Sequence, residues 1–257
     1  MEAIADTGAL APPSFSRPAF VRLVQIELRK SIDTRAGYWL LAATAALTVI
    51  AAIARAITGD DSSHALLPVL ETALAPTNVL LPVVGILLIT SEWSQRTALT
   101  TFVQVPGRLR VVTAKCAAGL ALGFVFYAIA IGVSVLAVAT LGAGAPEQWA
   151  FGAEMWLQFT AYVVLGMLMG LALGAALLAS APAIVTYFAA PTVVVILASF
   201  NSLESVLKWV DPSAMAQPMT QGPMSSAEFG HLLTSTAVWV AVPLAIGCWR
   251  ISRADID

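Results

Sequence analysis

One short polar segment between two long apolar stretches holds the residue types best suited to chemistry or to docking. It starts as SEWSQRT at residues 91–97, turns at Pro106-Gly107, and ends with cations up to Lys115. A carboxylate, an indole, an amide and a guanidinium within five residues suit a short helix at a membrane surface, which Pro106-Gly107 would end. The candidate contact residues are Glu92, Trp93, Arg96, Thr97, Pro106, Arg108 and Arg110.

Two interpretations of this segment stay open on composition alone. A short surface helix can dock into a cleft on a partner protein and transmit the partner's movement. Alternatively, the cations act only as a topological anchor on the cytoplasmic side. If the segment is helical, Glu92 and Arg96 lie four residues apart and share a face. As an exposed ion pair they would contribute only about 0.3–0.5 kcal/mol.

The sequence carries no recognisable catalytic or cofactor motif. It has no phosphate-binding G-x-x-x-x-G-K-[ST] loop, no H-E-x-x-H and no G-x-S-x-G. His64 and His231 fall at predicted outer membrane edges, where polar interface residues are common. The predicted outer loop contains three methionines, Met215, Met219 and Met224. They either fill apolar contacts at the membrane surface or act as soft ligands for Cu(I). We expect no catalytic residue, no bound cofactor and no metal on this chain.

Composition places these residues in a membrane protein. The chain has 257 residues, of which 59% are hydrophobic and 11% charged, with a mean hydropathy of +0.85. Soluble domains carry roughly 25% charged residues, whereas a lipid-facing protein has an apolar exterior as well as an apolar core. The net charge of −2 disfavours a nucleic-acid partner. Cys116 and Cys248 lie in apolar segments and are expected to be buried thiols.

Hydropathy predicts an all-α protein with six membrane spans, which are about residues 36–57, 76–90, 111–141, 149–179, 183–199 and 231–249. In the second stretch, Leu66–Thr90, the prolines predict an outer half-helix before a span that starts near Pro76. Ser180-Ala181-Pro182 is expected to be a tight turn. Five cations precede the first span, four lie between the second and third spans or in the first residues of the third, and two follow the sixth, whereas only Arg55 and Lys208 lie on the other side. This asymmetry predicts that both termini are cytoplasmic.

Three further segments carry structural expectations. Residues 1–17 are interpreted as a mobile tail before a single transmembrane domain, residues 18–257. Residues 19–33 read as an amphipathic helix that either lies in the membrane interface or extends the first span; Glu27 intrudes on its apolar side, and its cations include Arg22, Arg29 and Lys30. Gly166, Gly170 and Gly174 let another helix approach the fourth span closely, within one subunit or between subunits.

The string E-W-S-Q-R-T-A-L, followed by P-G-R-L-R and Lys115, resembles type-two ABC exporter permeases. The match covers Glu92, Thr97, Leu99, Pro106, Arg108 or Arg110, and Lys115, while Arg96 replaces a glycine that is frequent in the family. The resemblance implies that residues 91–110 carry a coupling helix and that residues 19–33 form an elbow helix. It also implies an outer re-entrant segment around residues 202–210, with Trp209 at the interface.

The same resemblance implies a transport subunit rather than an enzyme. It implies a bacterial inner-membrane protein that pairs with itself, or with a related chain, and with two ATP-binding cassette subunits that bind ATP and Mg. Few charges within the spans favour a hydrophobic or amphipathic substrate, such as a drug or a lipid. The alternatives are an ATP-independent secondary transporter, for which Glu71 and Glu154 are the candidate ionisable residues, and a membrane enzyme.

The cation asymmetry yields a topology prediction. In a variant without Cys116 and Cys248, single cysteines at Ser62, Gly144 and Ser225 should react with an impermeant thiol reagent in intact cells. A cysteine at Ser94 should react only after the cells are permeabilised. Labelling at Ser94 in intact cells would show that the orientation is inverted.

Overall fold

The computed structural model is all-helical over the residues that it describes, which are 18–58, 65–94, 107–141, 149, 152–200, 203–215 and 224–253. Within these ranges, six helices or continuous helical runs are long and apolar enough to cross a membrane, as in a multi-pass membrane protein. They are α2 (Arg35–Thr58), α3 (Leu66–Ser94), α5 (Arg108–Leu141), α6 (Ala153–Leu177), α7 (Ser180–Ala198) and the run Ser226–Arg253. The last run comprises α9 (Ser226–Thr236), the π-helical turn η5 (Ala237–Ala241) and α10 (Val242–Arg253).

Helix α3 is the centre of the packing. It lies against α2, α5 and α6, and its buried residues recur on every side of the helix. Phe159, Leu70, Leu74, Leu81 and Ile86 are among the largest side chains that are fully buried. By contrast, α2 and α7 expose most of their apolar side chains, which suits contact with lipid or with another subunit.

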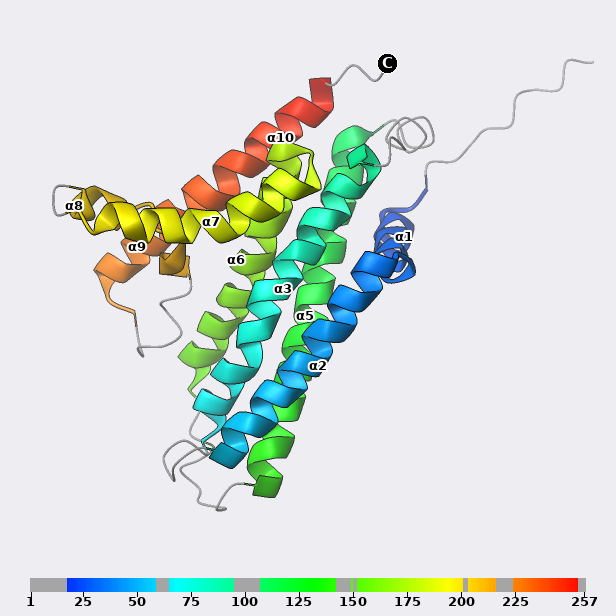
Figure 1. Cartoon of the computed structure of the whole chain (residues 1–257). Coiled ribbons are helices and arrows are strands. Elements are labelled where there is room, and N and C mark those ends of the chain that lie inside the picture. Colours follow the sequence, from blue (N-terminus) through cyan, green and yellow to red (C-terminus); the bar gives the residue numbers. More distant parts are fainter. Residues whose placement is uncertain are drawn as a thin grey trace, which may run out of the picture.

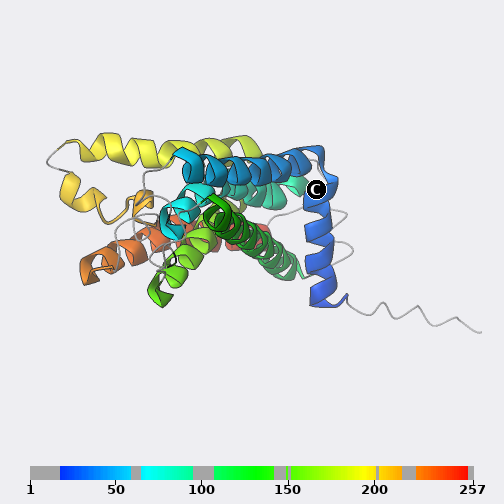
Figure 2. The ribbon, with the colours of Figure 1, turned by 90° about the horizontal axis from the view of Figure 1, so that it is seen from below.

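Helix α1 (Phe20–Asp33) runs across one end of this bundle, as Figure 2 shows. A sharp corner at Thr34 joins it to α2. The Thr34 hydroxyl accepts a hydrogen bond from the Gly37 amide, at 3.2 Å. A Cβ at Gly37 would collide with the Ser31 carbonyl, so the corner requires glycine there.

Helices α7 and α9–α10 diverge from the other spans toward a shared end, where α8 (Glu204–Leu207) and the 3-10 turn η3 (Pro212–Met215) lie between them (Figure 1). Hydrogen bonds connect this end to α9 and to the π-helical turn. The Trp239 indole donates to the Val210 carbonyl at 2.6 Å, and the Ser235 hydroxyl donates to the Asp211 carbonyl at 2.7 Å. The segment from α8 to η3 therefore packs on the last span as well as on α7.

The structure corrects two predicted boundaries. Helix α3 is continuous from Leu66 to Ser94, so the prediction of an outer half-helix followed by a span from Pro76 was wrong. The turn predicted at Ser180-Ala181-Pro182 lies earlier, at Leu178, which has a φ of 54°, and α7 already begins at Ser180. Pro182 is tolerated because the first turn of a helix needs no amide donor there.

Neighbouring groups explain why a proline can sit inside α3. Pro82 has no amide hydrogen, so the carbonyl of Asn78 loses its helical partner. The Tyr187 hydroxyl of α7 donates to that carbonyl at 2.7 Å. In a membrane, an unsatisfied backbone carbonyl costs roughly several kcal/mol of free energy. The hydrogen bond from Tyr187 removes this cost and so stabilises the proline-containing helix.

The glycines of α6 face α3. A Cβ at Gly170 would collide with the Pro82 carbonyl oxygen and lie 2.9 Å from the Pro82 Cα. A Cβ at Gly174 would lie 3.2 Å from the Ile86 Cα. In this structure the glycines therefore serve close packing of α6 on α3 within one chain.

This close approach predicts a large difference between two glycine substitutions. Gly170→Ala should destabilise the protein by about 1–3 kcal/mol, because its methyl group meets backbone that cannot move aside. Gly132→Ala in α5 is the matched control, since a Cβ there has nothing within 4 Å and alanine favours helix. Thermal unfolding in detergent should show a lower Tm for Gly170→Ala alone. Equal Tm values for the two variants would contradict the packing described.

Candidate functional site

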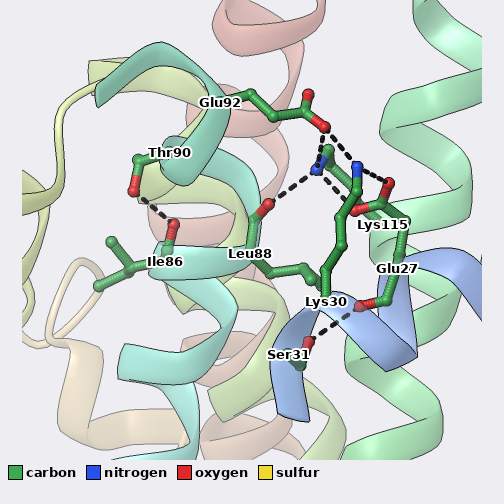
Figure 3. Close-up of polar contacts among 8 residues, drawn as sticks. All are labelled: Glu27, Lys30, Ser31, Ile86, Leu88, Thr90, Glu92 and Lys115. Atoms are coloured by element: carbon green, nitrogen blue, oxygen red, sulfur yellow. Dashed lines mark hydrogen bonds and ion pairs between the residues drawn. The ribbon is translucent and has the colours of Figure 1, made fainter. Parts of the chain in front are cut away.

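Four charged side chains meet at the end of the bundle that the cation distribution predicts to be cytoplasmic. Glu27 and Lys30 come from α1, Glu92 from the last turn of α3, and Lys115 from the second turn of α5. Figure 3 shows them converging from these three helices. We call these four residues the ionic cluster. Two carboxylates and two ammonium groups make it formally neutral.

Lys115 is the most buried cation of the ionic cluster, at 3% exposure. Its ammonium group donates to Glu27 Oε2 at 2.7 Å and to the Leu88 carbonyl at 2.9 Å. Glu92 Oε1 lies 3.3 Å away. The three acceptors match the three donors of an ammonium group, so this buried charge is fully satisfied.

Lys30 joins the same two carboxylates from the surface side. Its Nζ lies 2.8 Å from Glu27 Oε1 and 2.8 Å from Glu92 Oε1, and its side chain is 42% exposed. Burial lowers the pKa of Lys30, but hydrogen bonds and charge attraction from the two carboxylates outweigh it and raise the pKa above its ordinary 10.5. The stabilisation from its charged form is therefore present at neutral pH and is lost only as the pH rises through that raised pKa.

The local sequence explains how Glu27 reaches this position. Leu23, Glu27 and Ser31 recur every four residues and form the buried face of α1. Glu27 was interpreted from sequence as an imperfection of an amphipathic helix, whereas the structure makes it the bridge between Lys30 and Lys115. The available signal was an acid on an apolar face of one helix and a lysine inside an apolar span, since each such charge requires a partner.

The expectation that Glu92 is an exposed residue is wrong. Glu92 is 6% exposed and forms ion pairs with Lys30 and Lys115, and its pairing with Arg96 stays a prediction. Arg96, Thr97 and Pro106 lie outside the described residues, as does most of the predicted coupling helix. Residues 91–94 instead complete α3, with Trp93 half-buried.

The remaining predicted cations divide into two groups. Arg108 donates to the Ile251 carbonyl at 3.2 Å, and Arg110 donates to the Pro18 carbonyl at 2.8 Å. These two hydrogen bonds connect the start of α5 to the end of α10 and to Pro18, which lies just before α1. Arg22 and Arg29 are exposed on α1, away from the ionic cluster.

A cavity of about 460 Å³ adjoins the ionic cluster. Charged groups of the cluster line it together with hydroxyl groups from α1, α3 and α7, among them Ser31, Ser91, Ser94 and Ser180. The Ser180 hydroxyl lies 2.7 Å from the Thr90 hydroxyl and 3.3 Å from that of Ser94. The start of α7 is thereby fastened to the end of α3.

The outer residues singled out from sequence are placed at the opposite end of α7. Trp209 packs edge-on against His231 with ring centroids 4.6 Å apart, and it is 46% exposed. Met215 is buried in an apolar cluster with Met169. Among the described residues, no three His, Cys, Asp or Glu side chains gather as metal ligands would. Met219 and His64 lie outside them.

Comparison with models of known protein families and with curated proteins finds no match for the chain.

The burial of Lys115 predicts a strong effect of removing it. Lys115→Met should destabilise the protein by about 3–5 kcal/mol, because Glu27 and Glu92 lose a buried counter-charge. The double variant Glu27→Gln/Lys115→Met should recover part of this loss, since it removes one charge of each sign. Arg29→Gln, an exposed charge on α1, serves as the control and should stay within about 0.5 kcal/mol of wild type. Thermal unfolding in one detergent would measure these three variants and the single variant Glu27→Gln, and additive effects of Glu27→Gln and Lys115→Met would contradict a direct pairing.

Proposed function

We propose that this chain is the membrane-spanning permease subunit of an ATP-driven ABC exporter, with ATP hydrolysis on a separate chain. The observation that supports it most is the ionic cluster, which joins α1 to both helices that flank residues 95–106. These residues carry most of the segment whose sequence resembles the coupling region of type-two exporter permeases.

The ionic cluster gives this arrangement a mechanical rationale. A partner that presses on residues 95–106 acts directly on the ends of α3 and α5, which lie at Ser94 and Arg108. Because Glu27 binds Lys115 and Lys30 binds Glu92, α1 is fastened to both of those helices. The three helices would then move together rather than slide past one another. An interfacial helix with Arg22 and Arg29 exposed suits contact with anionic headgroups during such a movement.

Assembly with a second copy is part of the proposal. Exposed apolar side chains on α2 and α7 offer a surface for lipid or for a partner copy, including Trp39, Ile50, Val185 and Val195. Two permease chains and two ATPase chains would make the transporter. ATP and Mg would be held by the ATPase chains, because this sequence has no phosphate-binding loop.

The distribution of buried charge disfavours the alternative of a secondary transporter. Such proteins place ionisable groups near the middle of their spans for ion coupling. Among the described residues, the buried charged side chains are Glu27, Glu92 and Lys115, which all lie at one end of the bundle. Glu71 is half-buried near Arg55, toward the other end.

Purification from the membranes of source cells tests the proposal directly. A tagged chain should carry with it a protein that contains a phosphate-binding loop, in a complex of two copies of each. The complex should hydrolyse ATP, and the permease alone should not. A stable monomer without a bound ATPase, combined with transport driven by an ion gradient, would favour the secondary transporter instead.

Coupling should depend on Lys30 more than folding does. In Lys30→Gln the two carboxylates keep Lys115, so the protein should fold, whereas the direct tie between α1 and α3 is lost. We expect substrate-stimulated ATP hydrolysis and transport to fall together, with basal hydrolysis retained, in the reconstituted complex. Arg29→Gln on the same helix is the matched control and should keep full stimulation. Normal stimulation in Lys30→Gln at wild-type expression would show that α1 is only an anchor.

A further inference from the structure

A second cavity, of about 260 Å³, lies away from the ionic cluster, between α3, α6, α7 and the turn η3. Helices supply its walls and η3 closes one side with Pro212, Ser213 and Met215. The lining is aromatic and apolar for the most part, with Tyr162, Phe188 and Met169 prominent. None of its lining side chains carries a charge at neutral pH.

Asn78 is the unusual member of this lining. Its side chain is buried, at 9% exposure, and its Nδ2 donor has no hydrogen-bond partner. A buried donor without a partner costs about 1–3 kcal/mol. Native structures keep few such groups, and each calls for a specific explanation.

The neighbours of Asn78 show that its place is built into the packing. A Cβ at Gly166 would lie 2.9 Å from Asn78 Oδ1, so the glycine makes room for this amide. The Asn78 backbone carbonyl, freed by Pro82, accepts its bond from Tyr187, which also lines the cavity. That bond uses the proton of the Tyr187 hydroxyl, and the Asn78 Nδ2 donor makes no hydrogen bond to Tyr187 or to any other group among the described residues. Because χ2 of asparagine is a broad torsion, the amide can turn toward the cavity at little cost.

We propose that this cavity binds an uncharged, mainly aromatic or apolar molecule through one oxygen acceptor that receives a hydrogen bond from Asn78 Nδ2. The absence of charge in the lining excludes an ionised group inside the cavity, because burying an unpaired charge is far more costly than burying a carbonyl. The volume is smaller than the roughly 300–1,000 Å³ of pockets that enclose drug-sized ligands. The occupant is therefore a small molecule or one end of a larger one.

Binding to the cavity is a property of this chain alone. That the bound molecule is the transported substrate rests on the proposed exporter function. If both hold, the transported class is neutral amphipathic compounds with a carbonyl, ester or ether oxygen, and anionic compounds are poor substrates at this site.

Photolabelling with two matched ketones tests the cavity. Benzophenone is neutral, whereas 4-benzoylbenzoate adds a carboxylate to the same ring system. On irradiation the excited ketone takes a hydrogen atom from a nearby C–H bond, and the two carbon radicals join to give a tertiary alcohol. Methionine C–H bonds are favoured partners, so Met169 of α6 and Met215 of η3, which both line the cavity, are built-in reporters. The experiment uses the purified full chain in lipid nanodiscs and maps adducts by mass spectrometry.

Saturable benzophenone labelling should concentrate on Met169 and Met215, and 4-benzoylbenzoate should label them weakly. Asn78→Leu removes the donor at similar volume and loses no hydrogen bond from its Nδ2, so the fold should be retained. Its half-saturating benzophenone concentration should rise about 3- to 10-fold, the effect of one lost hydrogen bond. Unchanged saturation in Asn78→Leu, or equal labelling by both ketones, would overturn the proposal.

A second pair of variants protects the test against a folding defect in Asn78→Leu. Val79 lines the cavity and is 48% exposed, so Val79→Phe adds bulk beside the cavity with little risk to the core. Leu136→Phe, at a position 63% exposed on α5, is its control. Only Val79→Phe should lower labelling of Met169 and Met215. Equal labelling of Met169 and Met215 in both variants would show that benzophenone does not reach them from the cavity.

The outcomes separate the cavity from the exporter assignment. Specific labelling by a chain that recruits no ATPase would leave the cavity standing and remove the exporter function. A chain that forms the ATPase complex but shows no specific labelling would retain the proposed function and remove the cavity as its binding site. Competition by the neutral ketone, but not the anionic one, for transport by the assembled complex would support both.

Discussion

The buried ammonium group of Lys115 imposes the constraint on which the arrangement of the helix ends depends. A charge at 3% exposure must be paired and hydrogen-bonded, and its partners come from two other helices. Glu27 can reach it only if α1 lies across the end of the bundle. Glu92 and Leu88 can reach it only if the last turns of α3 lie beside the start of α5. Each lysine lies within ion-pair distance of both carboxylates, so removing one charged group leaves the opposite charges with a single partner instead of two.

A second constraint acts at the middle of α3, and it concerns the hydrogen bonding of a backbone carbonyl rather than the pairing of charges. Pro82 leaves the Asn78 carbonyl without a helical donor, and Tyr187 supplies one from α7. The same region of α3 is approached by the backbone of α6 through Gly170. Glycine on α6 and proline on α3 therefore bring three helices together around one small region. The cavity that Asn78 lines is a consequence of this arrangement.

Helix α3 carries both features on one continuous element. Asn78 and Glu92 are fourteen residues apart, which corresponds to roughly 21 Å along a straight helix. The helix is unbroken between them despite Pro82, and Ser180 fastens its end to the start of α7. A displacement of the α3 end would therefore reach the Asn78 region and α7 through covalent backbone and direct hydrogen bonds. This physical connection is what a transport mechanism driven from residues 95–106 would require.

The sequence by itself determined the features that depend on local composition. Apolar runs predicted an all-helical membrane protein with six spans, and all six recur within the described residues with boundaries that mostly differ by a few residues. Helical spacing also placed a helix over residues 19–33. The prolines of α3 misled the prediction, because α3 continues through both Pro76 and Pro82, and the donor that satisfies the Asn78 carbonyl freed by Pro82 is Tyr187, 109 residues away from Asn78.

Only the tertiary structure decided which charges meet. Glu27 and Lys115 are 88 residues apart, and Lys30 and Glu92 are 62 apart, so no periodicity along the chain links them. Sequence reasoning paired Glu92 with its helical neighbour Arg96, because local spacing is all that a single sequence displays. The cavity was equally hidden, since Asn78 is one polar residue in an apolar run until Gly166 and Tyr187 are brought to it. Burial and partnership are properties of packed helices, and packing joins residues that the sequence keeps far apart.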